Sequence, residues 1–286
     1  MPANYAQWVI DRSVTAMVVL HDGQIVHEAY YQSTTPEDLR IAWSVSKSWL
    51  SALFGILIDE GAIGSIDDPI LQYVPALAGS AYDGASIKNV LQMSSGVVFD
   101  EDYFDYDSDI NKMGRVLALG GSMDGFAAEL DATFAPAGQH WQYTSIDTHI
   151  LGMVIRGATG RSLPDLMEEK VVGPLKLEAD PYYLTDGHDV AFALGGINTR
   201  TRDSARFGQM FANGGAWQGQ QIVPADWVDA STVSSAPKPT GSMGYGYQWW
   251  MPPGAEPGVF HAQGVYGQYI YIDRNRNVVI ATNGAD

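Results

Sequence analysis

A serine and a lysine stand three residues apart at the start of a long apolar stretch, RIAWSVSKSWLSALFGILIDEG at residues 40–61. If a helix begins there, the side chains of Ser44 and Lys47 lie on one face, within hydrogen-bonding reach of each other. The amine could then take the proton of the hydroxyl, while the unpaired N–H groups of the first helical turn favour negative charge on a reacting oxygen. The pair therefore predicts a nucleophile and its base for acyl transfer.

Both residues also have ordinary structural uses. Ser44 could only cap the helix, as serine commonly does, and Lys47 could be solvated if the helix start is exposed. The neighbouring tryptophan and leucine side chains argue for burial, which would lower the pKa of the lysine toward that of a useful base. A second match to the same spacing, Ser235 and Lys238, stands beside two prolines and is predicted to be a loop.

Other catalytic chemistries find no support in the residues. No serine has glycines two positions before and two positions after it, which excludes the nucleophile elbow of the α/β-hydrolases. The six histidines form no HExxH pattern or other close metal pair, and the chain has no cysteine. We therefore expect no metal, no cofactor and no thiolate chemistry.

Charge and hydropathy narrow the partners and the compartment. Sixteen basic and thirty-three acidic residues give a net charge of −17, which would repel nucleic acid and anionic lipid surfaces. The first residues lack the basic and apolar regions of a secretion signal, and no uninterrupted apolar stretch reaches the ~18 residues of a membrane span. We expect a cytoplasmic protein that acts on a small molecule, without nucleic acid or membrane partners. The sequence does not indicate whether the protein forms oligomers.

The elements that must position the serine and lysine follow from periodicity. Residues 15–31 contain two strand-like runs around Asp22 and Gly23, a pair typical of a tight hairpin turn. The apolar residues of 49–58 recur at helical spacing nearly all round the helix, so this helix should be central and buried until a glycine ends it. Residues 62–190 are interrupted by prolines and glycines and favour short helices.

Strands return at the end of the chain. A helix is predicted over residues 202–213, and strand-like runs follow in GYGYQWWM at 244–251, in QYIYID and in VVIATN. This order predicts an α/β (α+β) fold, in which an antiparallel sheet built from both chain ends is flanked by helices and carries an inserted, mostly helical domain. The predicted α/β domain is discontinuous, residues 1–61 and 191–286, and the inserted domain is residues 62–190.

Four motifs, taken in order, resemble those of one enzyme superfamily. They are SVSK at 44–47, LQMSSG at 91–96, YTS at 143–145 and LGGINTRTRDSARFGQMFANGG at 194–215. Over nearly the whole chain, their order and spacing resemble the serine β-lactamase and penicillin-binding protein superfamily. The chain is most similar to its class C branch, with the family VIII carboxylesterases and the 6-aminohexanoate-dimer hydrolases, and EDYFD at 101–105 favours the latter. The resemblance implies a β-lactamase-like fold.

The resemblance also implies roles for individual residues. Ser44 would attack a carbonyl to form a covalent acyl-enzyme, and Lys47 and Tyr143 would exchange protons with it and with the leaving group. The lysine ammonium would lower the pKa of the tyrosine toward that of a usable base. Tyr143 could otherwise be an ordinary half-buried aromatic residue. Tyr103 would lie beside a leaving amine, although its acidic neighbours are also typical of a solvated loop, and Ser145 would contact the substrate.

The K-T-G strand motif of the superfamily is missing here. GVYG at 264–267 takes its place on the predicted strand. The backbone N–H of Val265 would join that of Ser44 as the oxyanion hole, with Tyr266 and Gly267 beside the substrate. Because the missing lysine would grip a substrate carboxylate, its loss favours neutral acyl substrates.

These observations predict a serine hydrolase that cleaves small carboxylic esters through an acyl-enzyme on Ser44, with linear amides such as aminohexanoate oligomers second. A β-lactamase or D,D-peptidase, and a sensor of the same fold that is acylated without turnover, are the alternatives. KPTG at 238–241 does not restore the missing motif, because proline in a central strand removes a hydrogen-bond donor. Relatives usually add a helix after the last strand, whereas this sequence ends at Asp286; either a sheet face is exposed or further residues follow.

Overall fold

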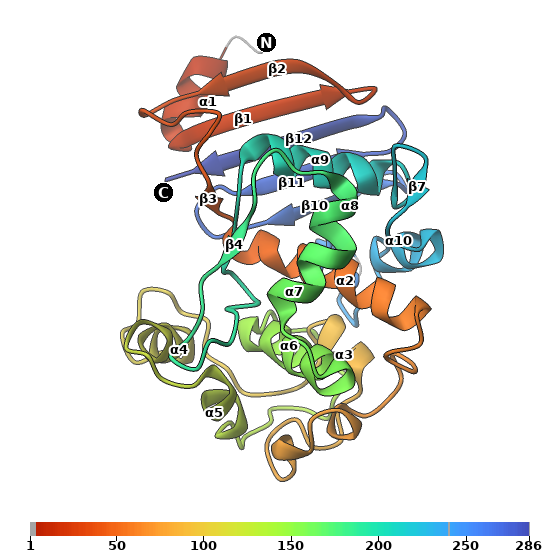
Figure 1. Cartoon of the computed structure of the whole chain (residues 1–286). Coiled ribbons are helices and arrows are strands. Elements are labelled where there is room, and N and C mark those ends of the chain that lie inside the picture. The colour runs from red at the N-terminus through yellow and green to blue at the C-terminus, as the bar shows by residue number, and fades with distance from the viewer. Residues whose placement is uncertain (1–3, 240, 286) are drawn as a thin grey trace.

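The main sheet joins the two ends of the chain. The structure is a computed structural model that describes residues 4–239 and 241–285. Seven strands follow the order β2-β1-β12-β11-β10-β9-β8, and each pair of neighbouring strands is antiparallel. Strand β1 (Val14–His21) therefore pairs with β12 (Val278–Gly284), as Figure 1 shows. The sheet predicted from both chain ends is confirmed.

Turn residues shape the hairpins at both ends of the chain. Between β1 and β2 (Gln24–Tyr30), Asp22 and Gly23 adopt positive φ angles of 50° and 74°, as a type I′ turn requires. The last hairpin joins β11 (Tyr269–Asp273) to β12 through a turn in which Asn277 also has a positive φ. Both hairpins lie where the sequence predicted them.

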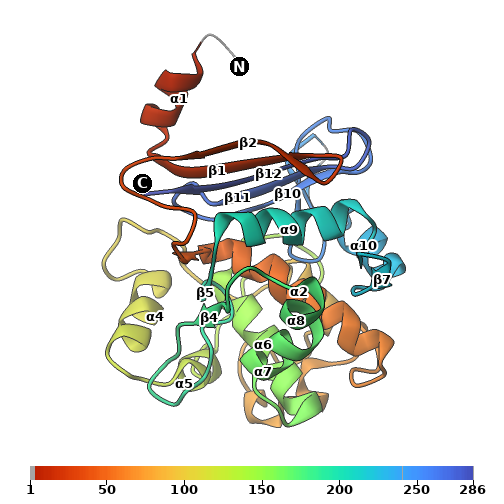
Figure 2. The same cartoon turned by 45° about the horizontal axis from the view of Figure 1, so that its top comes forward.

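Helix α9 (Thr201–Ala212) covers one face of the sheet, and the long helix α2 (Ser46–Asp59) lies beneath α9, toward the rest of the molecule (Figure 2). Helix α1 (Tyr5–Asp11) lies on the other side of the sheet. The Trp49 ring of α2 stacks on the Phe207 ring of α9 with a centroid distance of 3.9 Å. Residues 46–57 of α2 are all buried, as predicted for a central helix.

The chain between α2 and α9 forms mostly short helices. Four of them begin after a serine whose hydroxyl accepts a hydrogen bond from a backbone N–H of the first turn: Ser86, Ser108, Ser122 and Ser162. The helices are α3 (Ile87–Leu91), α4 (Asp109–Ala118), α5 (Met123–Ala128), α6 (Ser145–Thr159), α7 (Leu163–Met167) and α8 (Gly173–Leu175). 3₁₀ turns lie at Ile70–Gln72 and Pro75–Leu77, and a π-helical segment lies at Glu168–Val172. In the described residues, no helix is long and apolar enough to cross a membrane.

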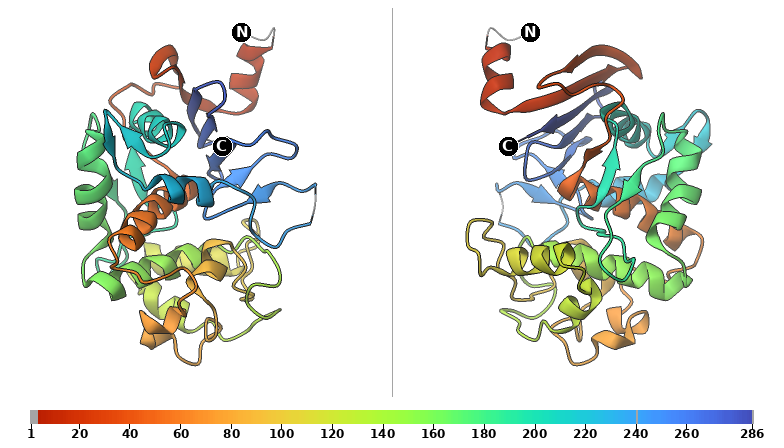
Figure 3. Two further views of the ribbon diagram at one scale, coloured as in Figure 1. Left: turned by 90° about the vertical axis from the view of Figure 1, so that its right-hand side faces the viewer. Right: turned by 60° about the vertical axis from the view of Figure 1, so that its left-hand side comes forward.

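The first helix, α1, and the last strand, β12, both lie at the main sheet (Figure 3). A smaller sheet connects distant parts of the chain. Its strands are β3 (Arg40–Ile41), β5 (Ile197–Thr199) and β4 (Tyr182–Tyr183), in that order. After α9 follow β6 (Ala216–Trp217), β7 (Gln220–Gln221) and α10 (Ala225–Ser231). The division into two domains at residues 61 and 190 stays a prediction.

The GYGYQWWM run is not one continuous strand. β8 (Gly244–Tyr245) and β9 (Trp250–Met251) pair with each other around a turn in which Gln248 has a φ of 66°. The turn buries the Gln248 side chain, which donates to the carbonyl of Leu91 at 2.9 Å and accepts from the hydroxyl of Thr148 at 2.7 Å. Because these bonds satisfy a buried amide, they favour the turn over an extended strand.

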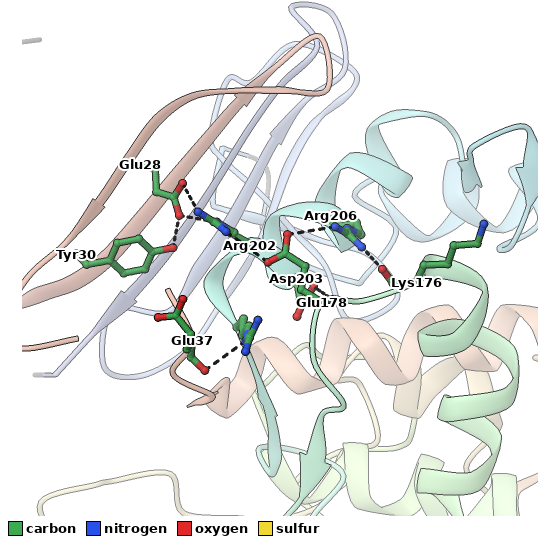
Figure 4. A network of polar contacts seen from close by, with 9 residues as sticks. Glu28, Tyr30, Glu37, Lys176, Glu178, Arg202, Asp203 and Arg206 are labelled. Atoms are coloured by element: carbon green, nitrogen blue, oxygen red, sulfur yellow. Dashed lines mark hydrogen bonds and ion pairs between the residues drawn. The ribbon is translucent and has the colours of Figure 1, made fainter. Parts of the chain in front are cut away.

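Charged side chains tie the first hairpin to α9 (Figure 4). Arg202 donates two hydrogen bonds to Glu28 of β2, at 2.6 and 2.9 Å, and the hydroxyl of Tyr30 donates to the same carboxylate. Glu178, which follows α8, pairs with Arg202 at 3.6 Å and with Arg206 at 3.3 Å. Hydrogen bonding to Arg202 lowers the pKa of Glu28. The network therefore links three segments that are far apart in the sequence.

Candidate active site

Ser44 lies in a turn that leads into α2. Residues Trp43–Val45 form a 3₁₀ turn that continues directly into α2 at Ser46, so Ser44 lies in the first turn of the helical segment. Trp43 holds a positive φ of 44°, which is unfavourable for a bulky residue and is typical of a functional turn. The Ser44 hydroxyl accepts a hydrogen bond from Nζ of Lys47 at 3.0 Å. Within the described chain it contacts no backbone N–H, which argues against a capping role.

Lys47 is buried at the start of α2, with 2% of its surface exposed. Its Nζ donates to the Ser44 hydroxyl and, at 2.9 Å, to the backbone carbonyl of Leu194. Burial lowers the pKa of Lys47 to about 7, and the nearby carboxyl groups of Glu101 and Asp147 oppose part of that fall. The burial expected from the sequence is confirmed, and near neutral pH a large fraction of the amine is unprotonated.

Tyr143 lies just before α6, and its ring stacks on Trp250 with a centroid distance of 5.5 Å. Lys47 Nζ is 5.4 Å from the centre of the tyrosine ring. Burial raises the pKa of Tyr143, and a hydrogen bond with the Ser44 side chain opposes this only in part. The expectation that Lys47 lowers the pKa of Tyr143 was therefore wrong, because the effect of burial on the phenol dominates. Burial also lowers the pKa of Lys47, so the lysine is only partly charged at neutral pH. The phenol stays protonated at neutral pH.

Val265 follows strand β10 (Val259–Gln263) in a turn and not on the strand, which corrects the predicted placement of GVYG. The flanking amides are occupied: Gly264 N–H donates to the carbonyl of Gln268 at 2.7 Å, and Tyr266 N–H donates to the Gln268 side chain at 3.2 Å. No acceptor in the described chain takes the Val265 N–H. A Cβ on Gly264 would lie 3.0 Å from the carbonyl oxygen of Ala42, so glycine lets this turn approach the Ser44 segment.

Ser44 and Val265 line two neighbouring cavities. The first, of about 220 Å³, is also lined by Tyr143, Trp250 and Glu101, and we call it the Tyr143 cavity. The second, of about 230 Å³, is lined on one side by helix α4, and we call it the α4 cavity. The two residues whose N–H groups are the candidate oxyanion donors therefore border both cavities.

Comparison with known proteins identifies the family. The family model described as Beta-lactamase matches residues 9–283, almost the whole chain. The chain belongs to the β-lactamase family. The 6-aminohexanoate-dimer hydrolase of Paenarthrobacter ureafaciens is 31% identical to it over 281 residues, which cover 93% of this chain and 71% of that protein.

Comparison with solved structures agrees with this assignment. A Bacillus anthracis protein provisionally named a 6-aminohexanoate-dimer hydrolase has a TM-score of 0.87 at 27% identity, covering 98% of this chain and 76% of that one. A class C β-lactamase has a TM-score of 0.72 at 20% identity, covering 97% and 88%, and supports the fold alone. The protein is a hydrolase of the serine β-lactamase fold.

In this β-lactamase-family protein, an acidic loop carries Tyr103 to the junction of the two cavities. The side-chain amide of Asn111 on α4 holds the loop by donating to the carbonyls of Asp102, Tyr103 and Asp105, at 3.3, 3.1 and 2.7 Å. Most of the loop is exposed, whereas burial raises the pKa of Tyr103. The loop is solvated and presents Tyr103 to the cavities, whereas the place of Tyr103 beside a leaving amine stays a prediction.

Sequence reasoning missed Glu101, which lines the Tyr143 cavity. The backbone N–H of Ser145, the first residue of α6, donates to its carboxylate. Burial raises the pKa of Glu101, and the nearby Lys47 opposes the rise. In the sequence Glu101 is one of several acidic residues in EDYFD, so only the fold distinguishes it from its exposed neighbours.

Sequence reasoning also missed Asp147, which is fully buried on α6. Its Oδ1 accepts a hydrogen bond from the hydroxyl of Tyr82 at 2.7 Å, and burial raises the pKa of Asp147 to about 8. The aspartate stands among the apolar residues of a helix, four positions after Tyr143, and this was the signal that could have found it. Together with Glu101 it raises the pKa of Lys47, against the larger lowering that burial causes.

The remaining predicted residues lie at different distances from the site. Ser145 and Tyr266 line the α4 cavity, and the Tyr266 ring packs edge-on against Trp43 with a centroid distance of 5.6 Å. Gly267 lines neither cavity, and its carbonyl accepts a hydrogen bond from the hydroxyl of Thr282 on β12 at 3.0 Å. The structure therefore places Gly267 against the sheet, behind the turn.

Lys238 does not replace the missing strand lysine. It lies in a loop, as predicted, with Nζ 3.0 Å from the centre of the Trp141 ring. Burial lowers the pKa of Lys238 to about 8. Among the described residues, no group of three or more histidine, aspartate or glutamate side chains is arranged to hold a metal ion.

Proposed function

We propose that this protein cleaves small carboxylic esters, and linear amides less readily, through a covalent acyl-enzyme on Ser44. The observation that carries the proposal is the hydrogen bond of 3.0 Å between the Ser44 hydroxyl and a buried Lys47 whose pKa is about 7. A lysine held at this pKa can accept a proton from serine at neutral pH, which a solvated lysine cannot do.

In the first step, the unprotonated amine of Lys47 takes the hydroxyl proton as Oγ of Ser44 attacks the substrate carbonyl. The N–H groups of Ser44 and Val265 donate to the resulting oxyanion; the amide of Val265 has no competing acceptor in the described chain. A preorganised pair of this kind contributes about 3 kcal/mol per donor to transition-state stabilisation in other hydrolases.

In the second step, the protonated phenol of Tyr143 donates its proton to the departing oxygen or nitrogen, and the ammonium of Lys47 returns a proton to the phenol. The net result moves the serine proton to the leaving group and leaves an ester on Ser44. Water then attacks this ester, and the same groups return the enzyme to its starting state. Esters are favoured because an alkoxide needs less help from an acid than an amine does.

Two alternatives of the same fold give different kinetics. A β-lactamase or D,D-peptidase would need a cation for the substrate carboxylate. The K-T-G motif that would supply this lysine is replaced by GVYG at 264–267, which contains no cationic residue. A sensor would be acylated once without turnover. Linear amides stay the second substrate class, and the name of the Paenarthrobacter ureafaciens relative supports testing an aminohexanoate dimer.

The test compares wild type with Ser44→Ala on p-nitrophenyl butyrate, nitrocefin and the 6-aminohexanoate dimer. We expect steady turnover of the ester, and a loss of about 10³-fold or more in Ser44→Ala. Ser235→Ala, from the second serine–lysine pair, is the matched control and keeps its activity. Ester turnover that survives in Ser44→Ala refutes the proposal, a burst of one equivalent favours the sensor, and nitrocefin as the best substrate favours the β-lactamase.

A further inference from the structure

The two cavities can be assigned to the two halves of a substrate. Tyr143 lines the Tyr143 cavity but not the α4 cavity, whereas Ser44 and Val265 line both. In the proposed reaction the phenol protonates the leaving group, so the leaving group must lie on the side of Tyr143. The acyl group then extends from the carbonyl carbon in the other direction, into the α4 cavity.

One wall of the α4 cavity is the apolar face of an amphipathic helix. Ile110, Met113 and Leu117 are spaced at three and seven residues on α4, so they project from one side of the helix. The polar side of the same helix carries Asp109 and Lys112, which pair at 3.4 Å. The helix therefore presents only hydrocarbon to the cavity along this stripe.

Apolar side chains from outside α4 line this cavity as well. Phe192 and Leu194 line it from the segment before β5, and the carbonyl of Leu194 is already bonded to Lys47. The polar side chains among the lining residues, which include Tyr103, Asn111 and Ser145, are neutral or stay protonated. Within the described part of the chain, no aspartate, glutamate, lysine or arginine lines this cavity. A charged acyl chain would therefore lose its hydration without gaining a counter-ion.

The volume of the cavity limits the shape of the acyl group. Its 230 Å³ lies below the range of about 300 to 1,000 Å³ that is common for pockets of drug-sized ligands. The space suits a single narrow chain more than a fused ring system, and its apolar walls favour methylene groups by burying their surface.

We propose that the α4 cavity selects an uncharged, unbranched alkanoyl group, so that the preferred substrates are esters or amides of simple fatty acids. This inference rests on the proposed acyl-enzyme reaction at Ser44. It separates this protein from an enzyme for 6-aminohexanoate oligomers, because the acyl half of such an oligomer ends in an ammonium group that would enter the apolar cavity.

The direct test compares p-nitrophenyl hexanoate, p-nitrophenyl 6-aminohexanoate and p-nitrophenyl acetate at pH 7.5, with the same leaving group in each. We expect kcat/KM for hexanoate to exceed that for 6-aminohexanoate by about tenfold or more and to exceed that for acetate. Equal or better use of 6-aminohexanoate overturns the inference while Ser44-dependent ester hydrolysis leaves the proposed function standing. If no ester is hydrolysed, or if Ser44→Ala is as active, both fail.

Substitutions at one position of α4 separate charge from shape. Leu117→Glu should shift the preference toward 6-aminohexanoate by about tenfold relative to the isosteric Leu117→Gln, because only the carboxylate supplies a counter-ion. Leu117→Trp should reduce hexanoate turnover more than acetate turnover. Leu119→Trp, on a residue of the same helix end that is 84% exposed and outside the cavity, is the control and should leave the ratios unchanged. Thermal unfolding confirms that each variant is folded, and unchanged ratios in folded Leu117 variants overturn the inference.

Discussion

At the residue scale, burial sets the proton affinities of the two groups nearest Ser44, and it moves them in opposite directions. It lowers the pKa of Lys47 because the charged form of an amine loses hydration, and it raises the pKa of Tyr143 because the charged form of a phenol does the same. One desolvated pocket therefore produces an unprotonated base and a protonated acid at the same pH. The opposite assignment, with Tyr143 as a phenolate base, would need a fully charged lysine beside the phenol. Burial lowers the pKa of Lys47 and so disfavours that charge.

The first prediction concerns the pH dependence of ester hydrolysis. Lys47 is competent as a base only when unprotonated, so kcat/KM should rise with pH and reach half of its plateau near pH 7. Because the pKa of Tyr143 is raised, no loss of activity from ionisation of the phenol is expected up to pH 9. Initial rates from pH 5 to 9, corrected for spontaneous hydrolysis, measure this. Lys47→Arg should be inactive across the range, since a guanidinium stays protonated. A midpoint near that of a solvated lysine would contradict the assignment.

The second prediction separates the roles of Tyr143. Tyr143→Phe removes the proton donor but keeps the stacked ring, so kcat for an ethyl ester should fall by about 10²-fold or more. The fall for a p-nitrophenyl ester should be smaller, because p-nitrophenolate departs without protonation. Steady-state rates on both esters of the same acid provide the comparison. Equal losses on both would show that the phenol acts in positioning and not as the acid.

At the scale of elements, close contact between helix α9 and the sheet depends on a glycine. A Cβ on Gly208 would lie 2.6 Å from a methyl carbon of Ile270 and 2.7 Å from one of Val279. This contact lets α9 pack closely on the sheet. Because α2 packs beneath α9, the contact also supports the helix that carries Lys47. Any larger side chain must push α9 away from the strands.

The third prediction tests this packing. Gly208→Ala should lower the free energy of unfolding by about 1 to 3 kcal/mol through overpacking, despite the better helix propensity of alanine. Gly114→Ala, in the interior of α4 with no heavy atom near the added methyl group, is the control and should raise stability by up to about 1 kcal/mol. Urea denaturation measures both changes. Equal stabilisation in the two variants would rule out the predicted overpacking.

The fourth prediction concerns the ion pair between β2 and α9. The pKa of Glu28 is lowered in the folded state, so its contribution to stability is present above the unfolded pKa of about 4.3 and is lost as the pH falls through the folded pKa. Glu28→Gln should therefore destabilise the protein at pH 7 by about 1 kcal/mol or less, and by a smaller amount at pH 3. Glu256→Gln, at a residue whose side chain is 64% exposed, should change stability little at either pH. A difference that does not depend on pH would contradict the linkage.

At the scale of the whole molecule, Gln248 joins the sheet to the helices below it. Its backbone carbonyl accepts a hydrogen bond from the hydroxyl of Ser48 on α2, and its side chain bonds Leu91 at the end of α3 and Thr148 on α6. The helix that follows Tyr143 and the helix that carries Lys47 therefore share one buried residue. This arrangement fixes the distance between the two sides of the site.

The fifth prediction follows from this role. Gln248→Leu leaves the Thr148 hydroxyl and the Leu91 carbonyl without their partner, so the free energy of unfolding should fall by about 2 to 3 kcal/mol. Because α2 and α6 lose a common anchor, kcat should fall as well at temperatures where the variant is folded. Calorimetry and ester turnover on the same samples measure both effects. A variant with unchanged stability would show that water satisfies these groups without cost.

The amino-acid sequence by itself determined the local features of this protein. The Asp22–Gly23 turn, the apolar helix from Trp49 onward and the strands at both ends depend on residue type and spacing along a few turns or strands, and the structure confirms them. The serine and lysine three residues apart belong to this class, since the start of a helix brings such a pair together.

Only the tertiary structure decided which distant groups surround that pair. Glu101 faces Lys47 because a loop folds inward, and Tyr143 keeps its proton because neighbouring rings exclude water from it. In the turn after β10, the N–H groups of Gly264 and Tyr266 bond to Gln268, whereas that of Val265 has no acceptor in the described chain and is available to a substrate. Burial and hydrogen-bond pairing depend on contacts between residues far apart in the chain, and the order of residues in one sequence does not contain them.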